Sequence, residues 1–177
     1  MTTYYVSSII GSDDNAGTSG SAPLASLQAA EDLVKPGDTV EVMNGTYTGP
    51  GGGNVLTIST SGTASAPITF EAAPGATPVI DSSGTWQGIE LDASYITIKG
   101  LTIVGDAANY NLSSAMAGYS TGNPDLDGNG IAATSGKLIH NIIIENNTIY
   151  NEPGGGIAIL NGDYLQILNN NVHDNAH

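Results

Sequence analysis

Branched apolar residues recur along this chain in pairs that lie five positions apart. The segment Ile144-Glu-Asn-Asn-Thr-Ile149 returns 23 residues later as Ile167-Leu-Asn-Asn-Asn-Val172. A more diverged copy, Ile98-Lys-Gly-Leu-Thr-Ile103, precedes both. A fixed period of this length is typical of a solenoid, in which each repeat is one coil that buries its apolar face only against its neighbours.

Short runs with apolar residues at alternate positions divide the chain into four such coils, at residues 55–80, 88–103, 130–149 and 156–172. Each coil reads as three very short strands with one face toward a shared interior. A leucine-rich repeat would need Leu where this chain uses Ile, and an antiparallel sandwich would need longer strands joined by hairpins. The pattern therefore predicts an all-β fold, a single-stranded parallel β-helix.

Residues 1–54 are predicted to form an N-terminal cap, and residues 55–177 the coils. A strand is expected at residues 3–6 and another at 39–43. Between them Ser26 is a plausible N-cap for a short helix over 27–34, with Leu27, Ala30, Leu33 and Val34 on one face. Such a helix would cover the apolar mouth of the first coil.

Gly100, Asn146 and Asn169 occupy the same slot in successive coils. Gly and Asn tolerate a left-handed backbone, so the slot predicts a tight bend between two strands. Stacked Asn side chains at this slot are also expected to form a hydrogen-bonded ladder.

Residues 105–129 interrupt the repeat without strand alternation, and we expect a structureless loop there. Its residues Tyr110 and Tyr119 either offer flat faces to sugar rings or pack the loop against the coil. The loop ends in Asp125-Leu-Asp127-Gly-Asn129-Gly130, which matches the first half of an EF-hand loop. Oxygen ligands at alternate positions suit Ca2+, so Asp125, Asp127 and Asn129 are candidate calcium ligands. The alternative is a polar turn that leads into the next strand.

The net charge of the chain limits the classes of partner that it can bind. The sequence has 17 acidic and 3 basic residues, a net charge of −14. Nucleic-acid binding is therefore not expected, because phosphate neutralisation needs clustered Lys and Arg. Cysteine is absent from the sequence, which excludes disulfides and thiolate metal sites, and no apolar run is long enough to span a membrane.

Glu90 shares the outward column of one strand face with Ala132 and Ala158, and we count it with the two tyrosines as a candidate substrate-binding residue.

Several segments resemble the pectate-lyase-like right-handed parallel β-helix superfamily. The runs Gly11-Ser-Asp-Asp-Asn-Ala-Gly-Thr18, Pro23-Leu-Ala-Ser-Leu-Gln-Ala-Ala30 and Asn44-Gly-Thr-Tyr47 are similar to its N-terminal cap. Residues 62–69 and 74–80 are similar to its first coil, including that of pectate lyase and chondroitinase B type lyases. The cap occurs on lyases, hydrolases, epimerases and non-catalytic surface proteins.

Residues 1–6 do not read as an export signal, so either the protein is cytosolic or its export signal was removed. The resemblance favours the second alternative and implies a secreted or cell-surface bacterial protein. It also implies calcium-assisted β-elimination on an acidic polysaccharide, or another glycan, in a groove along one sheet. No position here matches a catalytic residue of such lyases, so the alternative is a non-catalytic carbohydrate-binding or cell-surface structural module. The last coil closes without a capping element, and we expect either missing coils or a partner chain to cover it.

Overall fold

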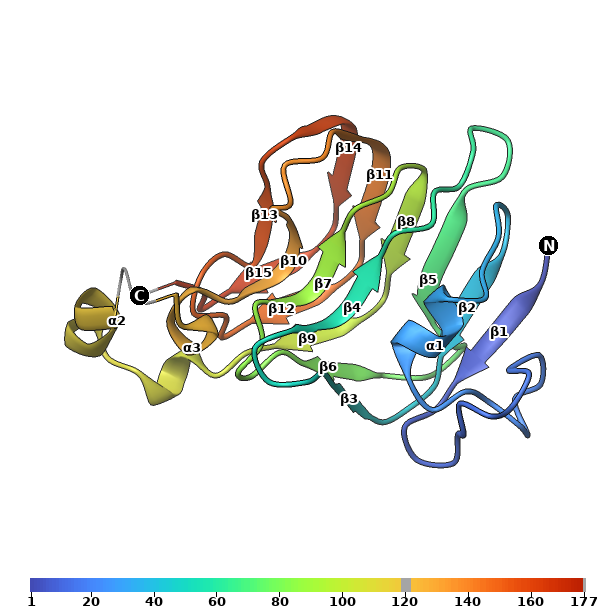
Figure 1. The fold of residues 1–177 in the computed structure, drawn as a ribbon, viewed down its shortest axis with the longest axis horizontal. Coiled ribbons are helices and arrows are strands. Elements are labelled where there is room, and N and C mark those ends of the chain that lie inside the picture. Colours follow the sequence, from blue (N-terminus) through green and yellow to red (C-terminus); the bar gives the residue numbers. More distant parts are fainter. Residues whose placement is uncertain (119–121, 177) are drawn as a thin grey trace.

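The structure, a computed structural model, describes residues 1–118 and 122–176 and is a parallel β-helix over that range (Figure 1). Within these residues the strands form three parallel sheets around one interior. Every full coil contributes one strand to each sheet, and consecutive coils pair strand to strand. The expected fold class is confirmed.

The first sheet runs β1-β2-β5-β8-β11-β14, the second β13-β10-β7-β4 and the third β15-β12-β9-β6-β3. Their bounds, in chain order, are β1 Thr3–Val6, β2 Thr39–Val42, β3 Thr46–Thr48, β4 Asn54–Ile58, β5 Ile68–Ala72, β6 Val79–Asp81, β7 Gln87–Leu91, β8 Ile96–Lys99, β9 Thr102–Val104, β10 Asn129–Ala133, β11 Ile139–Glu145, β12 Thr148–Tyr150, β13 Ile157–Ile159, β14 Gly162–Leu168 and β15 Asn171–His173.

Alternation along each short strand places one column of apolar side chains inside. In the first sheet Phe70, Ile98 and Ile144 stand in register, and all three are fully buried. The third sheet stacks Ile80, Ile103 and Ile149 in the same way. Because each side chain packs on the equivalent one in the next coil, the columns form one continuous core.

The N-terminal helix α1 (Leu27–Glu31) covers the first coil as expected. Ser26 Oγ accepts a hydrogen bond from Ala29 N at 3.1 Å, which satisfies a free donor of the first turn. Gln28 Oε1 accepts from Thr57 N at 3.0 Å, so the helix lies against the edge of β4. The helix is shorter than predicted, because it ends at Glu31, and Leu33 is 41% exposed instead of joining the buried face.

The predicted bends between the first and third sheets are confirmed. Gly100, Asn146 and Asn169 have φ of 71°, 56° and 54°. The asparagine ladder, however, lies one position later than predicted. Asn147 Nδ2 donates to Asn170 Oδ1 at 3.0 Å and to Ile98 O at 3.1 Å. The side chain after each bend points inward, where unpaired backbone groups need partners, whereas that of Asn146 is exposed.

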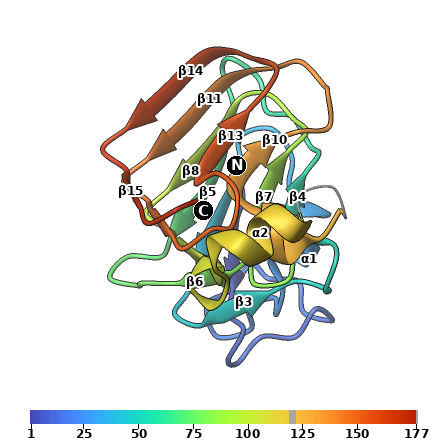
Figure 2. The same cartoon turned by 90° about the vertical axis from the view of Figure 1, so that its left-hand side faces the viewer.

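The inserted segment is not structureless, which corrects the prediction for residues 105–129. It holds a 3-10 turn at Ala107–Asn109, α2 at Leu112–Gly118 and α3 at Pro124–Asp127. Figure 1 shows α2 and α3 next to each other, and Figure 2 shows α2 at the end of the solenoid that carries the last coil. Among the described residues no helix has the length and apolar character needed to cross a membrane.

The last described coil leaves part of its apolar column uncovered. Ile167 is 50% exposed and Val172 is 44% exposed, although their counterparts Ile144 and Ile149 are fully buried. No strand pairs with the outer edges of β13, β14 and β15 in the described residues. This end therefore presents both backbone hydrogen-bonding groups and apolar side chains.

Candidate functional site

A polar groove of about 390 Å³ lies on the outer face of the second sheet. It crosses β4 and β7 and includes the segments that follow β7 and β10. The residues that line it are Asn54, Thr57, Trp86, Gln87, Glu90, Asp92, Thr134 and Ser135. The long inserted segment leads directly into β10, and the residues that follow β10 line this groove.

Hydrogen bonds between coils fix the floor of the groove. Asn129 Nδ2 donates to Gln87 Oε1 at 3.0 Å, and Gln87 Nε2 donates to Thr134 Oγ1 at 3.2 Å. The backbone of Trp86 is tied on both sides, since its N–H donates to Gly53 O and its carbonyl accepts from Asn129 N, each at 2.8 Å. The partly exposed indole ring therefore stands on a rigid segment at the groove wall.

Glu90 lies in the groove but is only 5% exposed. Its Oε1 accepts from Thr134 N at 2.8 Å and from Ser135 N at 3.0 Å. Ala132, its neighbour in register, is fully buried. The outward column of this strand face is therefore buried at both Glu90 and Ala132. Substrate binding by Glu90 stays a prediction, and the observed role of its carboxylate is to hold the loop that follows β10.

Asp92 and Lys137 form an ion pair at the edge of the groove. Lys137 Nζ lies 3.0 Å from Asp92 Oδ2. Although burial by itself would raise the pKa of Asp92, side-chain hydrogen bonds from Ser135 and Lys137 and the Lys137 charge lower it. Asp92 therefore stays ionised and does not act as a general acid near neutral pH. Two carboxylates face this groove, and one of them is paired with a cation.

The tyrosines of the inserted segment have different outcomes. Burial, followed by the charges of Asp106 and Asp125 and side-chain hydrogen bonds with both, raises the pKa of the Tyr110 hydroxyl. Tyr110 thus ties the start of the segment to α3, which agrees with the packing alternative. Its contact with sugar rings stays a prediction. Tyr119 lies outside the described residues.

The candidate calcium ligands do not form an EF-hand loop. Asp125 and Asp127 belong to α3, where Asn123 Oδ1 caps the first turn by accepting from Asp125 N at 3.1 Å. Asn129 Oδ1 already accepts from Gly155 N at 2.7 Å. Within residues 1–118 and 122–176 no group of three or more His, Cys, Asp or Glu side chains is arranged to hold a metal ion. Calcium binding by Asp125, Asp127 and Asn129 stays a prediction.

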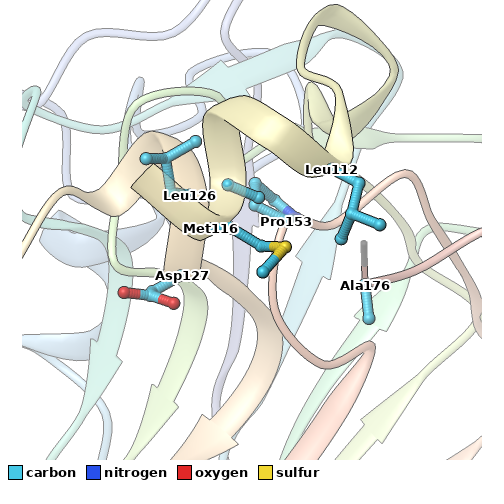
Figure 3. Close-up of a pocket in the computed structure, with 7 residues that line it drawn as sticks. Leu112, Met116, Leu126, Asp127, Pro153 and Ala176 are labelled. Atoms are coloured by element: carbon cyan, nitrogen blue, oxygen red, sulfur yellow. The ribbon is translucent and has the colours of Figure 1, made fainter. Parts of the chain in front are cut away.

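An apolar pocket of about 350 Å³ lies between the inserted segment and the last coil. Figure 3 shows the residues that line it, among them Leu112 and Met116 of α2, Leu126 of α3 and Pro153. Close backbone packing holds α3 there: Gly154 N donates to Gly128 O at 2.7 Å, and a Cβ at Gly154 would lie 2.7 Å from Asp127 O. Only glycine permits that approach.

Glu152 is fully buried beneath the inserted segment. Burial raises its pKa to about 8, and the charges of Asp106 and Asp81 add to the effect, against a hydrogen bond from Ser82. Both carboxylate oxygens lie 2.8 Å from Ser82 Oγ. A carboxyl group with this pKa suits a proton donor, but this one has no access to the groove, so its role is structural.

Trp86 is the functional candidate that sequence reasoning missed. The signal was available, since Trp86 is the one tryptophan of the chain and follows the turn at Gly84. The polar groove itself was less predictable, because residues from three coils and two loops build it.

The stacked coils, the short left-handed bends and a groove along one sheet define a right-handed parallel β-helix. The family model for the Pel9A-like, right handed beta helix region matches residues 4–177, so the chain belongs to that family.

Named relatives carry the comparison further. A lacto-N-biosidase of Bifidobacterium longum subsp. longum is 32% identical over 198 residues, which cover 86% of this chain and 12% of that protein. The pectate lyase PEL9 of Emericella nidulans is 44% identical over 87 residues, which cover 48% of this chain and 20% of that protein. The crystal structure of pectate lyase Pel9A superposes with a TM-score of 0.67 at 25% identity, over 92% of this chain and 37% of the other. The chain thus spans only a small part of the curated relatives that it matches.

Proposed function

We propose that the polar groove on the second sheet binds a glycan, and that the whole protein is carbohydrate-active. The observation that carries this proposal is the groove itself, in which a rigidly held indole lies beside amide, hydroxyl and carboxylate groups. Such sites combine a flat apolar surface for one face of a sugar ring with polar groups for its hydroxyls. The names of the relatives, a pectate lyase and a lacto-N-biosidase, support the same class of ligand.

For the reaction, we propose cleavage of an acidic polysaccharide by β-elimination, with calcium as the cofactor, and secretion as the location. Membership of the Pel9A-like family supports this proposal. The described residues suggest that this segment contributes binding contacts, because Glu90 is held by backbone donors and Asp92 is paired with Lys137. The second candidate, a non-catalytic glycan-binding module, is favoured by that same arrangement.

Glycan binding in the groove is tested by calorimetric titration of the chain with hexagalacturonate and with lacto-N-tetraose. We expect Trp86→Ala to weaken the binding of whichever glycan binds by about tenfold, since one aromatic contact is worth about 1.4 kcal/mol. Trp86→Phe is the matched control, because it keeps a flat ring, and it should bind nearly as the parent does. Equal affinity of the parent and the Ala variant would rule out this groove.

Lyase activity is tested by the ultraviolet absorbance of unsaturated products from pectate and alginate, with calcium added. An absorbance increase supports the lyase proposal for the protein assayed. Glycan binding without product would favour the binding module.

Calcium binding by the end of the inserted segment needs its own test. We expect a chain with both Asp125→Ala and Asp127→Ala to bind calcium more weakly than the parent in calorimetric titration, if the segment rearranges around the ion. Unchanged calcium binding in the double variant would remove Asp125, Asp127 and Asn129 from consideration.

A further inference from the structure

A second groove lies on the outer face of the first sheet, away from the proposed glycan groove. It has a volume of about 200 Å³ and follows the solenoid axis from the loop before β5 across β8 and β11 to β14. The residues that line it are Thr63, Ala64, Pro67, Tyr95, Thr97, Asn141, Ile143 and Gln166. None of these side chains is charged, in a chain whose net charge is −14.

One position in each of the last three coils of this sheet, just before β8 and within β11 and β14, has a left-handed backbone. Tyr95, Asn141 and Tyr164 have φ of 59°, 57° and 51°. They occupy one register slot in three successive coils, because the residues that follow them pair as Ile96, Ile142 and Leu165. Asn adopts this conformation readily, whereas an aromatic residue pays about 1 to 2 kcal/mol for it. The backbone conformation of the slot does not require Tyr, since the middle coil carries Asn141 there.

The ring of Tyr95 is held in place at the groove. It meets the ring of His140 edge to face, with centroids 4.9 Å apart and an interplanar angle of 86°. His140 is fixed in turn, because its N–H donates to Ser94 Oγ at 3.0 Å and its Nδ1 lies 2.9 Å from Asn141 Oδ1. Tyr164 is 72% exposed one coil beyond Asn141. A fixed ring and an open ring therefore stand on the same face.

We propose that this face is a second glycan-binding site, specific for an extended neutral oligosaccharide that runs along the solenoid axis. Tyr95 and Tyr164 are two coils apart, which places them roughly 10 Å from each other at about 4.8 Å per coil. That spacing suits two sugar rings of one extended chain. Thr97, Asn141 and Gln166 lie between or beside the tyrosines and offer hydroxyl and amide groups to sugar hydroxyls. The uncharged lining selects against uronates, because it offers no cation to neutralise a carboxylate.

The left-handed slot supplies a substitution that removes the rings without disturbing the fold. Tyr95→Asn combined with Tyr164→Asn places at both sites the residue that the middle coil already carries. Thermal unfolding of this double variant should occur at the same temperature as in the parent or at a higher one. Titration with cellohexaose, followed by calorimetry, should show a loss of affinity of at least about tenfold.

Two controls separate this site from the groove on the second sheet. Tyr95→Phe with Tyr164→Phe keeps both rings and should retain most of the affinity for cellohexaose. Trp86→Ala should leave cellohexaose binding unchanged, whatever it does to binding in the other groove. The proposed function and this inference can therefore fail independently.

Three outcomes overturn the inference. The first is that the parent chain binds neither cellohexaose nor xylohexaose at millimolar concentration. The second is that the double Asn variant binds them as tightly as the parent does. The third outcome is tighter binding of hexagalacturonate than of cellohexaose that depends on the two tyrosines, which would exclude a neutral ligand.

Discussion

At the scale of single residues, the bend between the first and third sheets requires a left-handed backbone, which few residue types adopt readily. Asn146 adopts φ of 56° with an exposed side chain, and Gly100 fills the same slot in the preceding coil at 71°. We expect Asn146→Ala to lower the free energy of unfolding by about 1 kcal/mol, because Ala resists a left-handed backbone. Urea unfolding monitored by circular dichroism measures this, with Asn146→Gly as the control that should stay near the parent.

Glu152 makes stability depend on pH. Its pKa is about 8 in the folded chain against 4.5 for an ordinary Glu, so the folded state holds the proton more tightly than the unfolded state. The contribution of Glu152 is therefore complete below about pH 4.5 and is lost as pH rises through about 8. Asp106, whose pKa is also raised by burial and by the charges of Asp125 and Asp81, acts in the same direction.

Glu152→Gln tests this assignment. Gln keeps the shape and the hydrogen-bonding capacity of the protonated acid. Between roughly pH 5 and pH 8, the unfolding temperature of the variant should therefore fall much less than that of the parent. At pH 8 it should be more stable than the parent. If thermal scans give the same pH profile for both chains, Glu152 is ionised in the folded state.

The sequence predicted the bend but not the residues around it, for physical reasons. A left-handed backbone admits few residue types, so Gly100, Asn146 and Asn169 are recognisable from their spacing alone. The choice of Asn147 over Asn146 for the ladder depends on which side chain points inward, and adjacent asparagines give no hint of that. Glu152 looks like any loop acid until neighbouring coils bury it.

At the scale of elements, the asparagine ladder joins coils where strands are shortest. Asn147 is 1% exposed; its Oδ1 accepts from Leu101 N at 2.9 Å, and its Nδ2 donates to the ladder. We expect Asn147→Ala to cost about 2 to 3 kcal/mol, because several buried backbone groups lose their partners. Asn170→Ala, at the half-covered end of the ladder, should cost clearly less in the same urea titration. Equal losses would mean that burial does not set the strength of the ladder.

The short helices of the inserted segment could not be predicted from the sequence pattern. Helix α2 spans Leu112–Gly118 and α3 spans Pro124–Asp127, too short for a periodic apolar face to appear in the sequence. The start of α3 is encoded locally, since Asn123 caps it and Pro124 occupies its first position. The calcium prediction falls on the same stretch: Asp125 and Asp127 lie in α3, and Asn129 begins β10.

At the scale of the whole molecule, the last described coil exposes an apolar surface. Ile167 and Val172 are about half exposed in the interior column, beside unpaired strand edges. We expect the isolated 177-residue chain to associate with rising concentration, and Val172→Lys to reduce this association, because a charge on that face opposes burial. Sedimentation velocity over a concentration series measures it. Ile9→Lys, at an apolar residue of the N-terminal cap that is 71% exposed, is the control that should leave the association unchanged.

The position of α1 at the first coil has a consequence for synthesis. The ribosome releases the N-terminal end first, so α1 and the first coil emerge before the coils that stack on them. Each later turn then meets a finished template and needs only local closure to add to it. Folding can thus proceed from the N-terminal coil toward the C-terminal one, and a coil that misfolds late leaves the coils before it folded.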